Sequence, residues 1–141
     1  MWLEGFLTAL QPLNLFYLVA GTAFGMVIGA LPGLGPLFGV ALMLPLTFGM
    51  PAATAIIFLT AVHAGTAYGD SFASIMINAP GGVGSVASCW DGHPMAQQGK
   101  AGVAMGISTF GSFIGGVAGW ISLVVLSPLL IMVAVAMGPP E

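Results

Sequence analysis

Residues 13–33 read LNLFYLVAGTAFGMVIGALPG, an apolar run without charge that ends in a Pro-Gly pair. Its length is close to the roughly 20 apolar residues that a helix needs to cross a bilayer. Proline lacks a backbone N–H and clashes with the preceding turn, so it stops most helices. The stretch therefore predicts a membrane-spanning helix over residues 13–31 that ends at Pro32.

The composition of the whole chain agrees with this prediction. Of its 141 residues, 58% are hydrophobic and 4% are charged, whereas a soluble domain carries about 25% charged residues. Residues 5–69 and 101–140 contain no charge at all. So few polar groups cannot cover a water-soluble surface, and one Lys with no Arg offers no basic face for nucleic acid. We expect an integral membrane protein in contact with the lipid bilayer.

Further apolar runs follow the first one. Residues 52–68 and 101–126 are long enough to span the membrane, whereas shorter pieces, interrupted or ended by proline, occupy residues 37–50, 71–79 and 129–137. The prediction is an all-α, polytopic membrane helix bundle with Gly/Pro-broken helices, either interrupted or re-entrant. We treat residues 1–141 as one transmembrane portion with a polar central region at residues 68–100.

Two of the breaks have similar sequences. Residues 30–36 read ALPGLGP and residues 78–84 read NAPGGVG. Unpaired backbone groups cost several kcal/mol in hydrocarbon, so broken helices lie inside protein or beside a water-filled cavity. Transporters use the freed groups at such half-helix ends to bind substrates and ions. A simple kink in each helix is the alternative interpretation.

Glycine also recurs at every fourth position inside two of the predicted spans. Residues four apart share one helix face, and small residues there let two helices approach closely. The pattern predicts helix packing at six positions: Gly21, Gly25, Gly29, Gly111, Gly115 and Gly119.

The polar central region holds three of the five charged residues, Asp70, Asp91 and Lys100. Ionisable groups at membrane depth usually face a cavity, so we expect functional roles for Asp70, Ser71 and Asn78. Residues 85–100 fit either a solvated loop or part of a translocation path. The single Lys favours a cytoplasmic position for the loop before residue 101.

Other interpretations of the polar residues carry less support. Residues 69–71 read Gly-Asp-Ser, as in one class of hydrolases, but that chemistry needs a properly oriented His. Cys89, Asp91 and His93 alternate, yet a zinc site requires more ligands and a firmer scaffold. Asp91-Gly92 followed by Pro94 favours a turn, in which Asp91 would cap backbone N–H groups. We expect no enzyme and no bound metal.

Several motifs together are similar to a known family. The order is GMVIGALPGLGP at residues 25–36, LPLTFG at 44–49, YGDS at 68–71, INAPG at 77–81 and DGHPMAQQGKAG at 91–102. This order and spacing resemble the large membrane subunit of the tripartite tricarboxylate transporters, the TctA family. The resemblance runs from about residue 15 to residue 138. The family's subunit is several times longer, so we expect a fragment, a truncated product or one piece of a split protein.

The resemblance implies a secondary transporter for tricarboxylates or related carboxylates such as citrate. It implies Na⁺ or H⁺ as the coupling ion and no further cofactor. It also implies a small membrane subunit and a periplasmic solute-binding protein as partners, in the bacterial inner membrane. The residues that carry over as substrate-binding are Gly33, Gly35, Tyr68, Gly69, Ser71, Asn78, Pro80 and Gly81. Asp70 stands where the family usually has a glycine, which suggests a role with the cation, shared with Asn78, or an altered specificity.

The sequence-based mechanism has the two Pro-Gly loops meeting. The N–H groups of Gly33, Gly35 and Gly81, with the side chains of Ser71 and Asn78, would bind substrate carboxylates. Glycine loops and helix ends favour anions without a buried positive charge. The alternative function is a small helical membrane scaffold, or a truncated remnant, that packs against a partner and transports nothing.

Overall fold

A computed structural model describes the backbone of residues 2–136 and the side chains of residues 4–132. All regular elements in this range are helical, which confirms the predicted all-α bundle. The chain divides into two compact units, residues 1–106 and residues 107–141. The elements are α1 (Trp2–Ala9), α2 (Pro12–Gly29), α3 (Pro36–Met43), η1 (Leu44–Thr47), α4 (Ala52–Ile77), η2 (Val83–Ser85), α5 (Val86–Gln97) and α6 (Ala101–Ala136).

Three of these helices are long and apolar enough to cross a membrane: α2, α4 and α6. The count of three spans predicted from the sequence is confirmed. Pro12 and Pro36 stand at the first turns of α2 and α3, where the missing N–H of proline has no helical partner to lose. At Pro45 the chain tightens into the short 3₁₀ helix η1.

Two predicted breaks are wrong. The polar residues 68–71 do not separate two helices, because α4 continues through them to Ile77. Gly69 lies there in close contact with α2, so packing compensates for its low helix propensity. Helix α6 likewise continues through Pro128, which agrees with the tolerance of membrane helices for proline.

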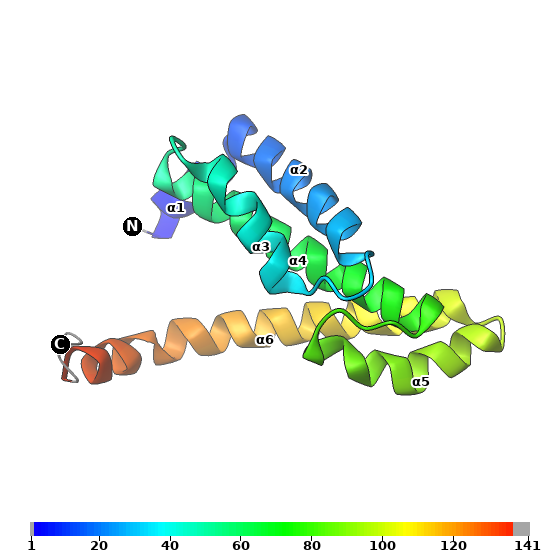
Figure 1. Cartoon of the computed structure of the whole chain (residues 1–141). Helices are drawn as coiled ribbons and strands as arrows, with labels where there is room; N and C mark the ends of the chain where they lie inside the picture. Colours follow the sequence, from blue (N-terminus) through cyan, green and yellow to red (C-terminus); the bar gives the residue numbers. More distant parts are fainter. Residues whose placement is uncertain (1, 137–141) are drawn as a thin grey trace. The chain divides into compact units, whose positions relative to one another are not determined.

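Helices α2 and α4 pack side by side and run in the same direction, with α3 as the return segment (Figure 1). A Cβ atom added at Gly21 would lie 2.9 Å from the carbonyl oxygen of Phe58, and one at Gly25 would collide with the carbonyl of Val62. One at Gly29 would collide with the carbonyl of Thr66. The partner numbers rise together along both helices, which is the signature of a parallel pair.

The face of α4 that meets α2 also carries glycine. A Cβ added at Gly65 would collide with the carbonyl of Thr22, and one at Gly69 would lie 2.8 Å from the backbone nitrogen of Ala30. Small residues on both helices therefore bring the two backbones together. On α6, a Cβ added at Gly111, Gly115 or Gly119 would meet open space among the residues that the structure describes. Their predicted role in packing stays a prediction.

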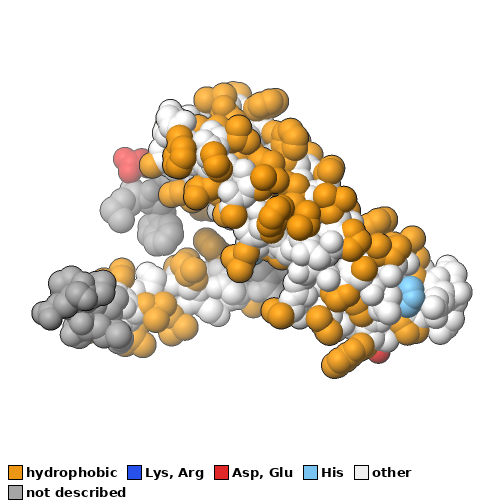
Figure 2. Space-filling view, viewed as in Figure 1, with side chains coloured by type: hydrophobic (Ala, Val, Ile, Leu, Met, Phe, Trp, Pro, Cys, Tyr) orange, Lys and Arg blue, Asp and Glu red, His pale blue; other side chains and the backbone are white. Residues whose placement is uncertain are grey.

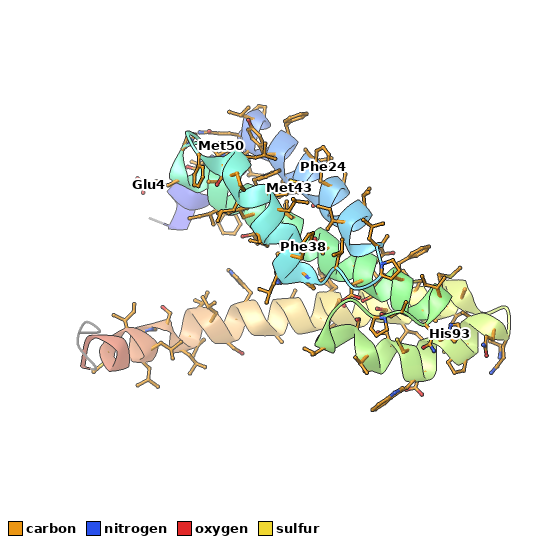
Figure 3. All side chains as sticks on the ribbon, in the orientation of Figure 1. Glu4, Phe24, Phe38, Met43, Met50 and His93 are labelled. Carbon is orange, nitrogen blue, oxygen red and sulfur yellow. The ribbon has the colours of Figure 1, made fainter. Side chains whose placement is uncertain are left out.

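The outer surface of these helices is apolar. Hydrophobic side chains cover most of the visible face of α2, α3 and α4 (Figure 2). Phe24 on α2 and Phe38 on α3 extend outward from their ribbons (Figure 3), and Leu37 is 82% exposed. Exposed large apolar patches in water would be unfavourable, so this surface fits a lipid environment.

The predicted turn at residues 91–94 is wrong, because the whole segment lies within helix α5. Gly92 serves close packing there, since a Cβ at this position would lie 2.7 Å from Cγ1 of Ile75 on α4. Asp91 is exposed and caps no backbone group among the described residues. The chain turns later, at Gly99, whose φ of +77° is a conformation that glycine adopts readily.

Candidate functional site

The two Pro-Gly loops contact each other. A Cβ added at Gly35 would lie 3.0 Å from the carbonyl oxygen of Gly81, and one at Gly81 would lie 3.0 Å from the carbonyl carbon of Leu34. The loops follow the C-terminal ends of the parallel helices α2 and α4, which brings segments separated by more than 40 residues together. A Cβ at either position would make an unusually tight contact, so the approach of the loops favours the two glycines that the sequence singled out.

The first loop, residues 30–35, leads from α2 into the N-terminus of α3. Gly33 has a φ of +84°, a left-handed conformation that glycine adopts without strain. Gly35 is the extended residue just before α3. Within the described part of the chain, neither the N–H of Gly33 nor that of Gly35 donates a hydrogen bond. This loop therefore has free backbone donors beside a helix N-terminus, an arrangement that suits anions.

The second loop begins with Asn78, which ends α4 in a left-handed conformation with φ +55° and ψ +35°. Its N–H donates to the carbonyl of Ser74 at 3.1 Å. Asparagine is the non-glycine residue that most often occupies such a helix-ending position. The Asn78 side chain is exposed and makes no hydrogen bond within the described residues, so its amide is free to bind a ligand. Pro80 follows, half-buried, and precedes Gly81.

The Asp70 carboxylate on α4 anchors the second loop. Its Oδ1 accepts a hydrogen bond of 2.6 Å from the N–H of Gly81 and one of 2.9 Å from the hydroxyl of Ser85. Asp70 is 3% exposed and Ser85 is 5% exposed. The N–H of Gly81, which the sequence-based mechanism assigned to substrate, therefore already has an acceptor inside the protein.

The other predicted residues on α4 point in different directions from Asp70. The hydroxyl of Ser71 donates to the carbonyl of Ala67 at 3.1 Å, within its own helix. Gly69 lies in the interface with α2 and is covered by that helix. Tyr68 is half-buried and makes no hydrogen bond among the described residues. The structure thus brings Gly35, Gly81 and Asp70 together, with Gly33 two residues before Gly35 and Pro80 next to Gly81, while Gly69 belongs to the helix interface.

No hydrolase arrangement forms around Ser71. His93 on α5 (Figure 3) uses its Nδ1 to contact the carbonyl oxygen of Ile75 at 3.0 Å, and its Nε2 lies 3.1 Å from Nε2 of Gln97. His63 is exposed and makes no hydrogen bond in the described part. Within the described residues, no group of three His, Cys, Asp or Glu side chains is placed to hold a metal ion.

Three polar features were missed by sequence reasoning. Asn14 is buried at 2% exposure and bonds to Thr54 on α4. Ser85 falls in the stretch that fits either a solvated loop or part of a translocation path, and the structure shows it as a buried partner of Asp70. The hydroxyl of Ser74, one turn after Asp70, is buried and has no hydrogen-bond partner in the described part. A polar residue inside an apolar run, as Asn14 is, would have been the signal for the first of these.

Comparison with known proteins identifies the family of the chain. Residues 15–141 match the family described as "Tripartite tricarboxylate transporter TctA family". The chain belongs to the TctA family. The resemblance inferred from the motifs is therefore confirmed. The TctA family is a family of transporters and not of enzymes.

The chain is also similar to a curated protein. The chain is 39% identical, over 137 residues, to an Agrobacterium vitis protein named "Uncharacterized 52.8 kDa protein in TAR-I ttuC' 3'region". The match covers 97% of this chain and 27% of the relative, so the chain spans about a quarter of the relative's length. No solved structure matches the chain. With three apolar helices of spanning length, this TctA member is a multi-pass membrane protein.

Proposed function

We propose that the chain forms part of the membrane permease of a secondary transporter for tricarboxylates or related carboxylates. In this proposal a periplasmic solute-binding protein delivers the substrate, a small membrane subunit accompanies the permease, and the complex lies in the bacterial inner membrane. A Na⁺ or H⁺ gradient drives uptake. Membership of the TctA family supports the class of transport.

The contact between the two Pro-Gly loops is the observation that carries the proposal. The first loop holds the unpaired N–H groups of Gly33 and Gly35 just before the N-terminus of α3, and the contact sets the second loop against Gly35. Irregular backbone with free donors is costly in a membrane unless it is buried in protein or lines a water-filled path. Carboxylates satisfy such donors, since each oxygen accepts hydrogen bonds and the helix N-terminus favours negative charge.

The roles of the individual residues follow from this arrangement. Gly33 and Gly35 would donate to substrate carboxylates, and the free side chain of Asn78 lies at the start of the facing loop. We assign Asn78 and loop carbonyl groups to the coupling ion in preference to Asp70, because two donors already occupy Oδ1 of Asp70. A carbonyl-rich loop at the end of a broken helix suits a small cation.

Uptake of radiolabelled citrate and succinate tests the proposal. Cells that carry the gene at its native locus are compared with a deletion strain, with and without an imposed Na⁺ or H⁺ gradient. We expect gradient-dependent uptake of at least one of these carboxylates, lost on deletion. Equal uptake of both compounds by the deletion strain would contradict the proposal.

A matched pair of glycine variants then locates the site. Gly35→Ala places a methyl group against the carbonyl of Gly81 and should reduce uptake at least tenfold at an unchanged membrane level of the protein. Gly84→Ala changes the second loop where a Cβ meets open space, and should leave uptake unchanged. Normal uptake in both variants would favour the scaffold interpretation for this chain.

A further inference from the structure

The Asp70 side chain supplies a hydrogen-bond acceptor at the loop contact. Its Oδ1 takes the N–H of Gly81 and the hydroxyl of Ser85. A backbone N–H of a glycine loop and a neighbouring hydroxyl are the kind of donors that hold the carboxylate of a bound ligand. Both contacts fall on Oδ1, while the Ser85 hydroxyl, which has one proton, also lies 2.9 Å from the carbonyl oxygen of Gly82.

The second oxygen of Asp70 lies where the two loops meet. A Cβ added at Gly82 would be 3.1 Å from Oδ2 of Asp70 and 3.3 Å from Cδ of Pro36, the first residue of α3. The Asp70 carboxylate therefore lies near the start of α3 and near Gly35, whose N–H donates no hydrogen bond among the described residues. A ligand carboxylate bound to the N–H of Gly35 would come close to Asp70.

No cation in the described part of the protein pairs with the Asp70 carboxylate. The only Lys or Arg of the chain is Lys100, which is exposed and follows α5. The two histidines do not serve either, since His63 is exposed and His93 bonds to Ile75 and Gln97. Two like charges at short range repel strongly where water is scarce. The site therefore holds an acidic side chain of its own that has no cationic partner among the described residues.

We propose that Asp70 determines specificity by occupying the position that one substrate carboxylate would otherwise take. The site then accepts a dicarboxylate in preference to a tricarboxylate, because the third carboxylate would lose its donors and meet the charge of Asp70. This inference rests on the proposed function, and it names the substrate class of the same site.

Competition between two probes tests the inference on the unaltered protein. Uptake kinetics are measured for succinate and citrate in the native-locus cells, as single substrates and in competition. We expect a KM for succinate at least tenfold below that for citrate. A KM for citrate equal to or below that for succinate would overturn the inference while leaving the proposed transport function intact.

Variants of Asp70 provide the second measurement. Asp70→Asn keeps an oxygen that can accept from Gly81 and Ser85 but removes the charge, so it should lower the ratio of the citrate KM to the succinate KM at least tenfold. Asp91→Asn is the matched control, because Asp91 is an exposed aspartate on α5. An unchanged ratio in a properly inserted Asp70→Asn variant would refute the assignment. Absence of uptake of both compounds by the unaltered protein would instead refute the proposed function.

Discussion

Thr54 on α4 donates a hydrogen bond of 2.7 Å to the side-chain oxygen of Asn14 on α2, which lies 40 positions earlier in the chain. The Asn14 amide nitrogen in turn donates to the carbonyl of Thr8 at 2.6 Å. Asn14 is 2% exposed and Thr54 is 4% exposed. Buried polar groups need partners, so this chain of bonds fixes the register of α2 against α4 and ties α1 to both.

The first prediction concerns this pair. Thr54→Val keeps the shape of the side chain and leaves the Asn14 oxygen without a donor, so we expect a loss of about 1–2 kcal/mol in the free energy of unfolding. Thr60→Val changes an exposed threonine on the same helix and should shift stability by less than about 0.5 kcal/mol. Unfolding of the purified protein in detergent measures both. Equal stability of the two variants would show that the bond contributes nothing to packing.

The second prediction concerns the glycine interface. Gly25→Ala drives a methyl group into the carbonyl of Val62, and overpacking of this kind costs about 1–3 kcal/mol. Gly106→Ala, on α6 where a Cβ meets open space, should gain up to about 1 kcal/mol from helix propensity. Both substitutions replace glycine with alanine, but the expected changes in stability have opposite signs. Thermal unfolding in detergent distinguishes them, and a stabilising Gly25→Ala would refute close packing of α2 on α4.

Much of this arrangement follows from sequence, and the exceptions have physical causes. Apolar length predicted α2 and the start of α6, although α6 continues through the break expected at Pro128. The Pro-Gly pairs marked the two loops correctly. The continuity of α4 through Gly69 and Asp70 could not be predicted, because it depends on α2 covering Gly69. The same holds for α5, where Gly92 and Pro94 resemble a turn but pack a helix against Ile75. Tertiary contact overrode local propensity in both places.

Some features of the candidate site could likewise be predicted from the sequence, and others could not. Glycine and proline positions were visible in the sequence, since backbone demands select those residue types. The bonds from Gly81 and Ser85 to Asp70 were not visible, because a side-chain partner 11 or 15 positions away leaves no periodic signal. Consequently Asp70 was considered as a cation ligand or a change of specificity, and its role as the anchor of the loop came only from the structure.

The third prediction separates the conformation of Asn78 from its chemistry. Asn78→Ala places alanine in a left-handed conformation and should cost about 1 kcal/mol of stability. Asn78→Gly keeps that conformation and removes the amide, so its stability should match the unaltered protein within about 0.5 kcal/mol. If the amide binds the coupling ion, gradient-driven uptake is lost in both variants. Normal uptake by Asn78→Gly would show that the role of Asn78 is limited to ending α4.

The fourth prediction uses Cys89 as a probe of α5. A carbonyl oxygen only accepts, so the Nδ1 of His93 carries the proton that bonds to the carbonyl of Ile75, in the last turn of α4. Carbonyls there have no partner within the helix. His93→Ala should loosen α5 and raise the rate of maleimide labelling at the buried Cys89 severalfold. His63→Ala removes an exposed histidine and should leave that rate unchanged; a rise in both variants would contradict the anchoring role.

The parallel pairing of α2 and α4 also imposes a delay between the synthesis of one helix and the synthesis of its partner. Thr54 follows Asn14 by 40 residues, and a ribosome adding about 5–20 residues per second takes about 2–8 s to reach it. During that interval the glycine face and the Asn14 amide of α2 have no α4 to contact. Either the insertion machinery or lipid must cover them until the return segment brings α4 alongside. Assembly of this pair therefore follows a fixed order, in which α2 is synthesised before the helix that it contacts.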